Sequence, residues 1–105
     1  MKTVRITKTP ESGNYVVNIG EHINVVVEEG VKCNIIHQQG ALGDQYHEGV
    51  GGQYHEGKGD QIHYGEGHQY HYGIGDQYHE GKGDQYHEGK GYQDHHGEGD
   101  QFYYG

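Results

Sequence analysis

Histidine recurs every eight residues through the second part of the chain, and it is the residue type best able to do chemistry here. Seven histidines hold the same place in successive segments, at His47, His55, His63, His71, His79, His87 and His95. Imidazole is the commonest metal ligand in proteins and titrates near pH ~6.5. A regular array could therefore bind Zn, Fe, Ni or Cu, or respond to mild acid. These seven are the candidate metal ligands, and a transition metal is the one cofactor that the sequence suggests.

The histidines belong to an octapeptide repeat that runs from Gly43 to Gly105 without a slip in register. Its eight copies are GDQYHEGV, GGQYHEGK, GDQIHYGE, GHQYHYGI, GDQYHEGK, GDQYHEGK, GYQDHHGE and GDQFYYG. Glutamine is third in every copy, at Gln45, Gln53, Gln61, Gln69, Gln77, Gln85, Gln93 and Gln101. A repeat this strict indicates one structural unit stacked on itself or on copies from other chains. The glutamines are the candidate assembly residues, because stacked strands bond glutamine to glutamine in a ladder.

Each copy of the repeat is expected to form a short strand and a tight turn. Two glycines per copy would cost a helix about 1 kcal/mol each, whereas x-Gln-Tyr-His-x between glycines suits a strand. In a strand, the third and fifth places share one face, and the second, fourth and sixth share the other. In GYQDHHGE, Tyr92 and Asp94 exchange the usual places of acid and aromatic, which keeps both on one face. We predict that the Gln/His face is packed, with an inward tyrosine face as the alternative.

The first 40 residues are predicted to form a short β-strand assembly segment, and residues 41–105 form the repeat. Apolar residues alternate from Val4 to Ile6 and over 15–19, 23–27 and 31–35, with a turn cluster at 10–13. Such short strands leave open edges, which must be paired by the repeat or by other chains. Cys33 is the only cysteine, so no intrachain disulfide exists, and we expect it to be a small buried residue.

The negative charge of the chain is confined to the repeat. Residues 1–40 hold four basic and four acidic residues, whereas the repeat holds twelve acids and three lysines, so the net charge of −9 lies there. An acidic surface repels phosphate, which argues against a nucleic-acid partner. No stretch is long and apolar enough to span a membrane, and no secretory signal is visible. We expect a cytosolic chain, one assembled into a particle inside its cell, or one that has lost a leader.

Over residues 43–105 the chain resembles repetitive β-fibres such as the slender trimeric needles of phage tail fibres. The likeness lies in the glycine-punctuated extended copies and in one histidine per copy along an axis. In those needles, intertwined chains hold iron through a His-x-His pattern, and three parallel chains would supply a ring of three histidines at each level. This chain contains no His-x-His, and its nearest approaches are His68-Gln-Tyr-His71 and His95-His96. The resemblance therefore implies the fibre more strongly than the iron.

A second, shorter resemblance lies in the N-terminal segment. Val17-Asn18-Ile19-Gly20, followed by Asn24, is similar to the V-Q-V-G core of amyloid-forming signalling motifs. In those motifs, cross-β stacking passes a signal between proteins. The resemblance implies an amyloid-type signalling or adhesive module as one alternative function.

No catalytic constellation is present in the sequence, and the repeat lacks serine and threonine altogether. We expect a non-enzymatic, all-β, homo-oligomeric protein in which short N-terminal strands precede an octapeptide-repeat β-solenoid or intertwined β-fibre. Two copies would form a rung of sixteen residues, so that the repeat makes four rungs. The expected function is a self-assembling fibre or filament subunit, in a virion as a phage tail fibre or as an extracellular appendage. A metal-binding histidine array and the amyloid-type module are the alternatives.

Overall fold

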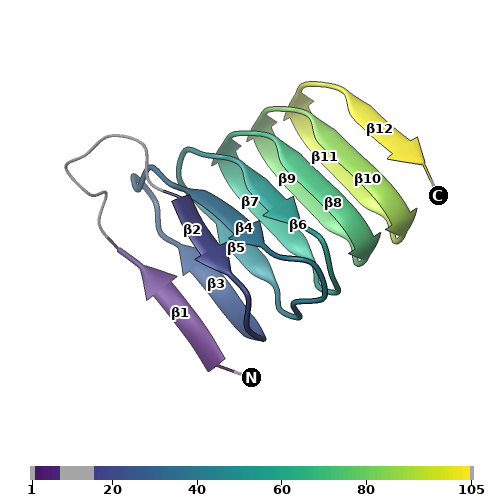
Figure 1. Cartoon of the computed structure of the whole chain (residues 1–105). Helices are drawn as coiled ribbons and strands as arrows, with labels where there is room; N and C mark the ends of the chain where they lie inside the picture. Colours follow the sequence, from purple (N-terminus) through teal and green to yellow (C-terminus); the bar gives the residue numbers. More distant parts are fainter. Residues whose placement is uncertain (1, 8–15, 105) are drawn as a thin grey trace.

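The chain folds into two parallel β-sheets that face each other. The computed structural model describes residues 2–7 and 16–104, which contain strands and turns and no helix. The strands are β1 (Lys2–Ile6), β2 (Val16–Ile19), β3 (Ile23–Val27), β4 (Asn34–His37), β5 (Gln45–His47), β6 (Gln53–His55), β7 (Gln61–Glu66), β8 (Gln69–Ile74), β9 (Gln77–Lys82), β10 (Gln85–Lys90), β11 (Gln93–Glu98) and β12 (Gln101–Tyr104). Odd-numbered strands form one six-stranded sheet and even-numbered strands form the other. The chain thus winds as a β-solenoid, which confirms the predicted fold class (Figure 1).

Each turn of the solenoid within the repeat takes sixteen residues, which is two copies of the octapeptide. Gln45 pairs with Gln61 and Gln53 pairs with Gln69 in the parallel register, each across sixteen residues. Because neighbouring strands lie about 4.8 Å apart, equivalent side chains stack directly along the axis. Strands β5 to β12 make the four rungs that the repeat predicted.

Strands β1 to β4 belong to the same two sheets as the repeat. β3 pairs with β5 and β4 pairs with β6, so the repeat covers one edge of the N-terminal strands. The offset is longer here: Val25 pairs with Gln45, a difference of 45 − 25 = 20 residues. Gly30 and Gly40 adopt left-handed backbone conformations, with φ of 84° and 83°, in the turns that hold the extra residues.

The predicted strand at 31–35 has the right inward alternation but the wrong boundaries. Val31, Cys33 and Ile35 are all buried, as their alternation predicts. Continuous pairing begins only at Asn34, where β4 starts, and Lys32 forms a single bridge with Val50. The predicted turn at 10–13, together with Tyr15, lies outside the described residues.

The interior of the solenoid changes from apolar to polar along its axis. Ile19, Val25, Val27, Val31, Cys33 and Ile35 form an apolar cluster between the first strands. From Gln45 to His87, the interior positions are glutamine and histidine, with essentially no exposed surface. The register joins the two parts, since Val25 pairs with Gln45 and Val27 with His47. The prediction that the Gln/His face is packed is confirmed, and the alternative of an inward tyrosine face is wrong.

Close stacking of the turns explains the glycine that opens each copy. Gly51 has φ of 144°, which side-chain-bearing residues rarely adopt, and a Cβ there would overlap the carbonyl oxygen of Cys33. The adjacent Gly52 lies outside this φ range, and its Cβ would come no closer than 3.4 Å to the His68 carbonyl oxygen. Two neighbouring glycines therefore differ in whether the fold requires them.

We expect Gly51→Ala to destabilise the fold by about 3 kcal/mol or more, because the new methyl group meets rigid backbone. Gly52→Ala should change the free energy of unfolding by less than about 1 kcal/mol, since its Cβ would make only ordinary van der Waals contacts. Urea denaturation of the two variants measures both values. Equal losses at the two positions would contradict the close stacking of turns at Gly51.

Candidate functional site

The interior glutamines form two columns, one from each sheet, which we call the glutamine columns. Within a column, the Nε2 of each glutamine donates to the Oε1 of the glutamine one turn earlier, as from Gln61 to Gln45 and from Gln77 to Gln61, both at 2.8 Å. The same Nε2 also donates across the solenoid to a backbone carbonyl of the opposite sheet, as from Gln61 to Tyr70 at 3.0 Å. Each interior amide therefore ties together successive turns and both sheets.

The repeat histidines stack beside the glutamines in two further columns, the histidine columns. Their ring centroids lie 4.5–5.0 Å apart and their planes lie within 11° of each other. His37 begins the even-numbered column and Tyr103 ends it, stacked on His87 at 5.1 Å. Sequence reasoning missed His37, because it precedes the octapeptide frame. Extending the inward alternation of Val31, Cys33 and Ile35 by one step would have found it.

A hydrogen bond to the backbone fixes the tautomer of each column histidine. The Nε2 of His55, His71 and His87 lies 2.6–2.7 Å from the carbonyl oxygen of the glycine twelve residues earlier. A carbonyl oxygen only accepts hydrogen bonds, so Nε2 must carry the proton and Nδ1 must be an acceptor. In His47 and His55, Nδ1 accepts from the N–H of Gly49 and Gly57.

Four Nδ1 atoms in the histidine columns are buried and have no hydrogen-bond partner. They belong to His63, His71, His79 and His87. On these strands, β7 to β10, the pairing continues through the seventh-place glycine, as with Gly65 and Gly81. In the turns of β5 and β6, the corresponding glycines lie beyond the strand and direct their N–H at the ring. The longer strands thus leave the imidazole lone pair unsatisfied.

Burial makes the histidine columns resist protonation. Desolvation lowers the pKa of the imidazoles at His37, His47, His71 and His79, and lowers it to about 4 at His55 and about 3 at His63. At His55 and His63, the stacked histidines on either side lower the pKa further, while the bond to the backbone carbonyl opposes the shift. These six imidazoles are therefore neutral at pH 7.

The column geometry gives the histidines structural contacts rather than a ligand set. Each of the seven candidate ligands directs Nε2 at a backbone carbonyl. Within residues 2–7 and 16–104, no group of three or more His, Cys, Asp or Glu is placed to hold a metal ion. His68 and His96 lie outside the columns, where His96 Nε2 is 2.9 Å from Asp94 Oδ1.

The acids at the second place of the repeat have a structural role that sequence reasoning missed. Asp44 accepts a hydrogen bond through Oδ1 from the backbone N–H of Asp60 at 2.9 Å, and Asp60 accepts one from Asp76 in the same way. The ladder starts one turn earlier, where Asn24 Oδ1 accepts a hydrogen bond from the backbone N–H of Asp44. The sixteen-residue offset between second places is the signal that could have revealed it.

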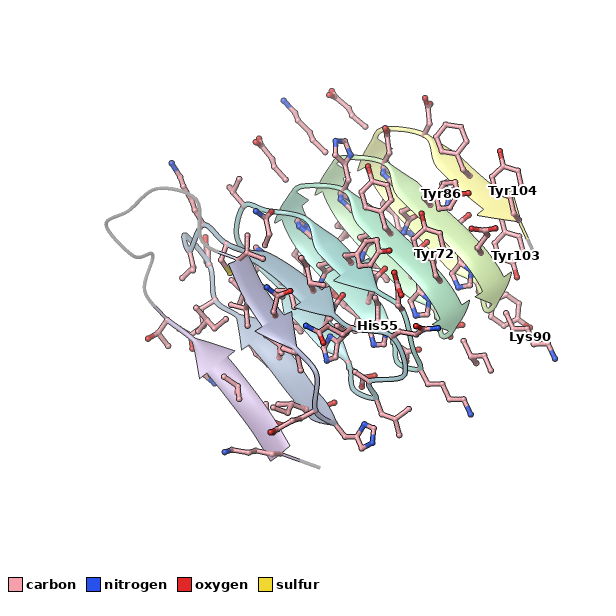
Figure 2. The ribbon with its side chains drawn as sticks, viewed as in Figure 1. His55, Tyr72, Tyr86, Lys90, Tyr103 and Tyr104 are labelled. Carbon is pink, nitrogen blue, oxygen red and sulfur yellow. The ribbon has the colours of Figure 1, made fainter. Side chains whose placement is uncertain are left out.

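Eight of the described tyrosines lie on the outer faces in two groups, which we call the tyrosine arrays (Figure 2). The even array comprises Tyr54, Tyr70, Tyr72, Tyr86 and Tyr104, and the odd array comprises Tyr46, Tyr64 and Tyr78. Neighbouring rings are tilted by 43–54°, with centroids 5.5–6.4 Å apart. The outer surface therefore combines regularly spaced aromatic rings with carboxylates.

Comparison with known proteins identifies no protein family, curated protein or solved structure that matches this chain. In the part of the chain that the structure describes, no helix is long and apolar enough to cross a membrane. The candidate function therefore rests on the geometry of the columns, the arrays and the two ends of the solenoid.

We expect Gln77→Leu to cost about 3 kcal/mol or more of folding stability. The substitution removes the bonds from Gln77 Nε2 to Gln61 and to the Tyr86 carbonyl, and it leaves Gln93 Nε2 with the Phe102 carbonyl as its remaining acceptor. Each buried group without a partner costs about 1–3 kcal/mol. Gln101→Leu, on the exposed last strand, is the matched control and should cost about 1 kcal/mol. Urea denaturation that gives equal losses would contradict the role of the glutamine columns.

We expect the fold to be lost under mild acid. The folded-state pKa values of six column histidines lie below the unfolded value of about 6.5. Below that pH the unfolded chain binds more protons, so stability falls by up to about 1.4 kcal/mol per pH unit for each such histidine. All six histidines act in the same direction, so the folded state is progressively destabilised as the pH falls below about 6.5.

Circular dichroism between pH 8 and pH 4 measures this transition, and a chelator at pH 8 is its control. The β-sheet signal should be constant above pH ~6.5, should decline below it, and should be unchanged by chelator. A flat profile down to pH 4 would contradict buried neutral histidines. Loss of the signal with chelator at pH 8 would instead show that a metal holds the columns.

Proposed function

We propose that this chain is a structural, self-assembling fibre subunit without enzymatic activity, of the type found in phage tail fibres or extracellular appendages. A repetitive β-solenoid suits this role, because its turns stack along one axis and present the same side chains at each step. The observation that carries the proposal is that both ends of the solenoid present edge strands. Its partner is a further copy of itself.

Both ends of the solenoid present edge strands. β1 and β2 end the two sheets on one side, and β11 and β12 end them on the other (Figure 1). The outer edge of such a strand carries a row of N–H and C=O groups ready to pair with another strand. Within residues 2–7 and 16–104, no helix covers these edges. Axial association would satisfy them.

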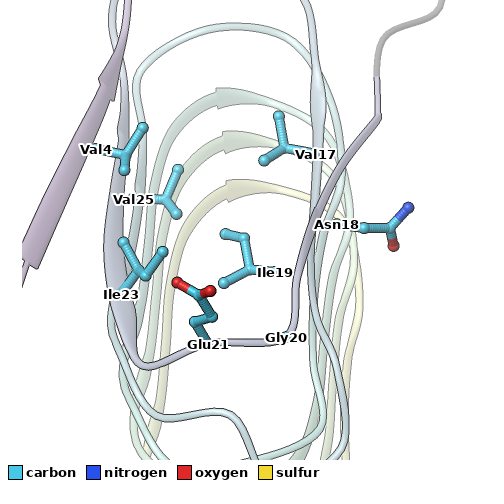
Figure 3. Close-up of a pocket in the computed structure, with 8 residues that line it drawn as sticks. All are labelled: Val4, Val17, Asn18, Ile19, Gly20, Glu21, Ile23 and Val25. Carbon is cyan, nitrogen blue, oxygen red and sulfur yellow. The ribbon is translucent and has the colours of Figure 1, made fainter.

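The two ends differ in chemistry, which favours contacts between like ends. At the N-terminal end, a cavity of about 320 Å³ is lined by Val4, Val17, Ile19 and neighbouring residues (Figure 3). At the C-terminal end, Gln93 and Gln101 end the glutamine columns. Two apolar ends are stabilised when they bury each other's apolar surface. Two polar ends are stabilised when their amides form hydrogen bonds with one another. Two different two-fold contacts that alternate along an axis generate a filament.

The charge of the repeat favours axial over lateral growth. The net charge of −9 lies on the outer faces of the repeat, so parallel fibres repel one another at neutral pH. The same charge disfavours nucleic acid as a partner. The segment that resembles the amyloid signalling motif forms β2 and the glycine after it, so it would act here as an edge strand at the apolar end.

Light scattering and electron microscopy of four variants test the proposal. The wild type should form particles much longer than the 38 Å of one chain. Val4→Lys with Val17→Lys charges the apolar end, and Gln93→Lys with Gln101→Lys charges the polar end. Because each pair blocks one contact, each should stop growth at a dimer, and all four changes together should give monomers.

Tyr70→Lys is the matched control, because it adds a lysine on the outer face and should leave fibre length unchanged. A stable wild-type monomer at micromolar concentration would overturn the proposed function. Long fibres from both end variants would overturn the pairing of like ends.

A further inference from the structure

Tyrosines of successive turns approach one another in a continuous zigzag along the even array. The ring centroids of Tyr54 and Tyr72 are 5.5 Å apart, those of Tyr72 and Tyr86 are 5.6 Å apart, and those of Tyr86 and Tyr104 are 5.5 Å apart. Figure 2 shows Tyr72, Tyr86 and Tyr104 in succession on one face. The odd array repeats the pattern from Tyr46 through Tyr64 to Tyr78, at 5.6 and 5.7 Å.

The zigzag arises from an alternation at the sixth place of the repeat. On the even face this place holds Glu56, Tyr72, Glu88 and Tyr104 in successive turns. Tyr54 and Tyr86, at the fourth place, therefore each meet a sixth-place tyrosine of an adjacent turn and have a glutamate at the sixth place of their own copy. The arrangement recurs every two turns and brings the rings of different turns together.

The carboxylates of the arrays accept hydrogen bonds from the phenols. Tyr46 donates its hydroxyl to Glu48 Oε1 at 2.7 Å, and Tyr54 donates to Glu56 in the same way. These bonds raise the pKa of both phenols to about 12, so the hydroxyls keep their protons at neutral pH. A tyrosine that loses an electron becomes strongly acidic, and the bonded carboxylate is placed to take its proton.

We propose that the tyrosine arrays are a site of oxidative modification, where a one-electron oxidant joins tyrosines of successive turns as dityrosine. Each of two neighbouring tyrosines loses one electron and one proton to become a phenoxyl radical. The radicals form a carbon–carbon bond between ring positions next to the hydroxyls, and the two ring hydrogens there move to the oxygens. The net loss is two hydrogens per cross-link, and a peroxide that accepts them is reduced to two waters.

The consequence is a second covalent connection between successive turns, in addition to the backbone that joins them. Tyr70 and Tyr104, with 41% and 58% of their surfaces exposed, give an oxidant access to the even array, whose other rings are half-buried. Tyr92 has 81% exposure and belongs to neither array. It therefore separates the effect of the array geometry from that of simple exposure. This inference does not depend on fibre assembly.

Oxidation of the dilute full chain by a haem peroxidase with limiting hydrogen peroxide tests the proposal. Dityrosine fluorescence should appear, and mass spectrometry should find single chains lighter by two hydrogens per cross-link. Lys58 and Lys82 place Tyr54, Tyr72 and Tyr86 on three different tryptic peptides. Fragment-ion spectra then locate the joined residues, and the expected cross-links of the even array are Tyr54–Tyr72 and Tyr72–Tyr86.

Tyr72→Phe and Tyr92→Phe are the matched variants, each with its β-sheet circular dichroism checked before oxidation. Tyr72→Phe should abolish these two cross-links, whereas Tyr92→Phe should leave their yield unchanged. The proposal is overturned if cross-links follow exposure and centre on Tyr92. It is equally overturned if they form only between chains, or if the same pairs form with equal yield in urea.

Discussion

A glutamine amide in the interior must find partners for two hydrogens and an oxygen, because leaving them unpaired is costly. Gln61 meets this demand by bonding Gln45 along the axis and the Tyr70 carbonyl across it. Both bonds require the next turn to lie in register and the opposite sheet to lie at a fixed distance. The strict sixteen-residue turn follows, since a slip of one residue would send the whole glutamine column outward.

The rest of the interior adapts to this spacing. Stacked imidazoles fill the space beside the amides, and each ring from His55 to His95 donates to the carbonyl of an opening glycine, as His71 does to Gly59. That carbonyl is reachable because successive glycines stack with no Cβ between them. Apolar side chains such as Val27 and Ile35 occupy the equivalent interior places near the N-terminus. The solenoid therefore has an apolar core in its N-terminal turns and a polar core in the repeat.

The interior positions of the repeat are nearly the same in every copy, whereas the outer positions vary. The second, fourth and sixth places change from copy to copy, as Tyr46, Ile62 and Asp94 illustrate at the fourth place. The second place nevertheless takes part in the stacking of turns, because Asp44 accepts a hydrogen bond from the backbone N–H of Asp60 in the next turn. The outer faces thus carry both the net negative charge of the repeat and the aromatic rings whose spacing the turns determine.

The strand periodicity, the inward Gln/His face and the sixteen-residue rung were predictable from the sequence, because each depends on local alternation and on an unbroken repeat. Other features depend on which strand stacks on which. An intertwined fibre would use the same local conformations, so only the tertiary structure decides that the next rung comes from the same chain. The place of His37 in its column, the unpaired Nδ1 of His63 and the approach of Tyr54 to Tyr72 follow from that stacking. These contacts join residues of different turns, and no local pattern records them.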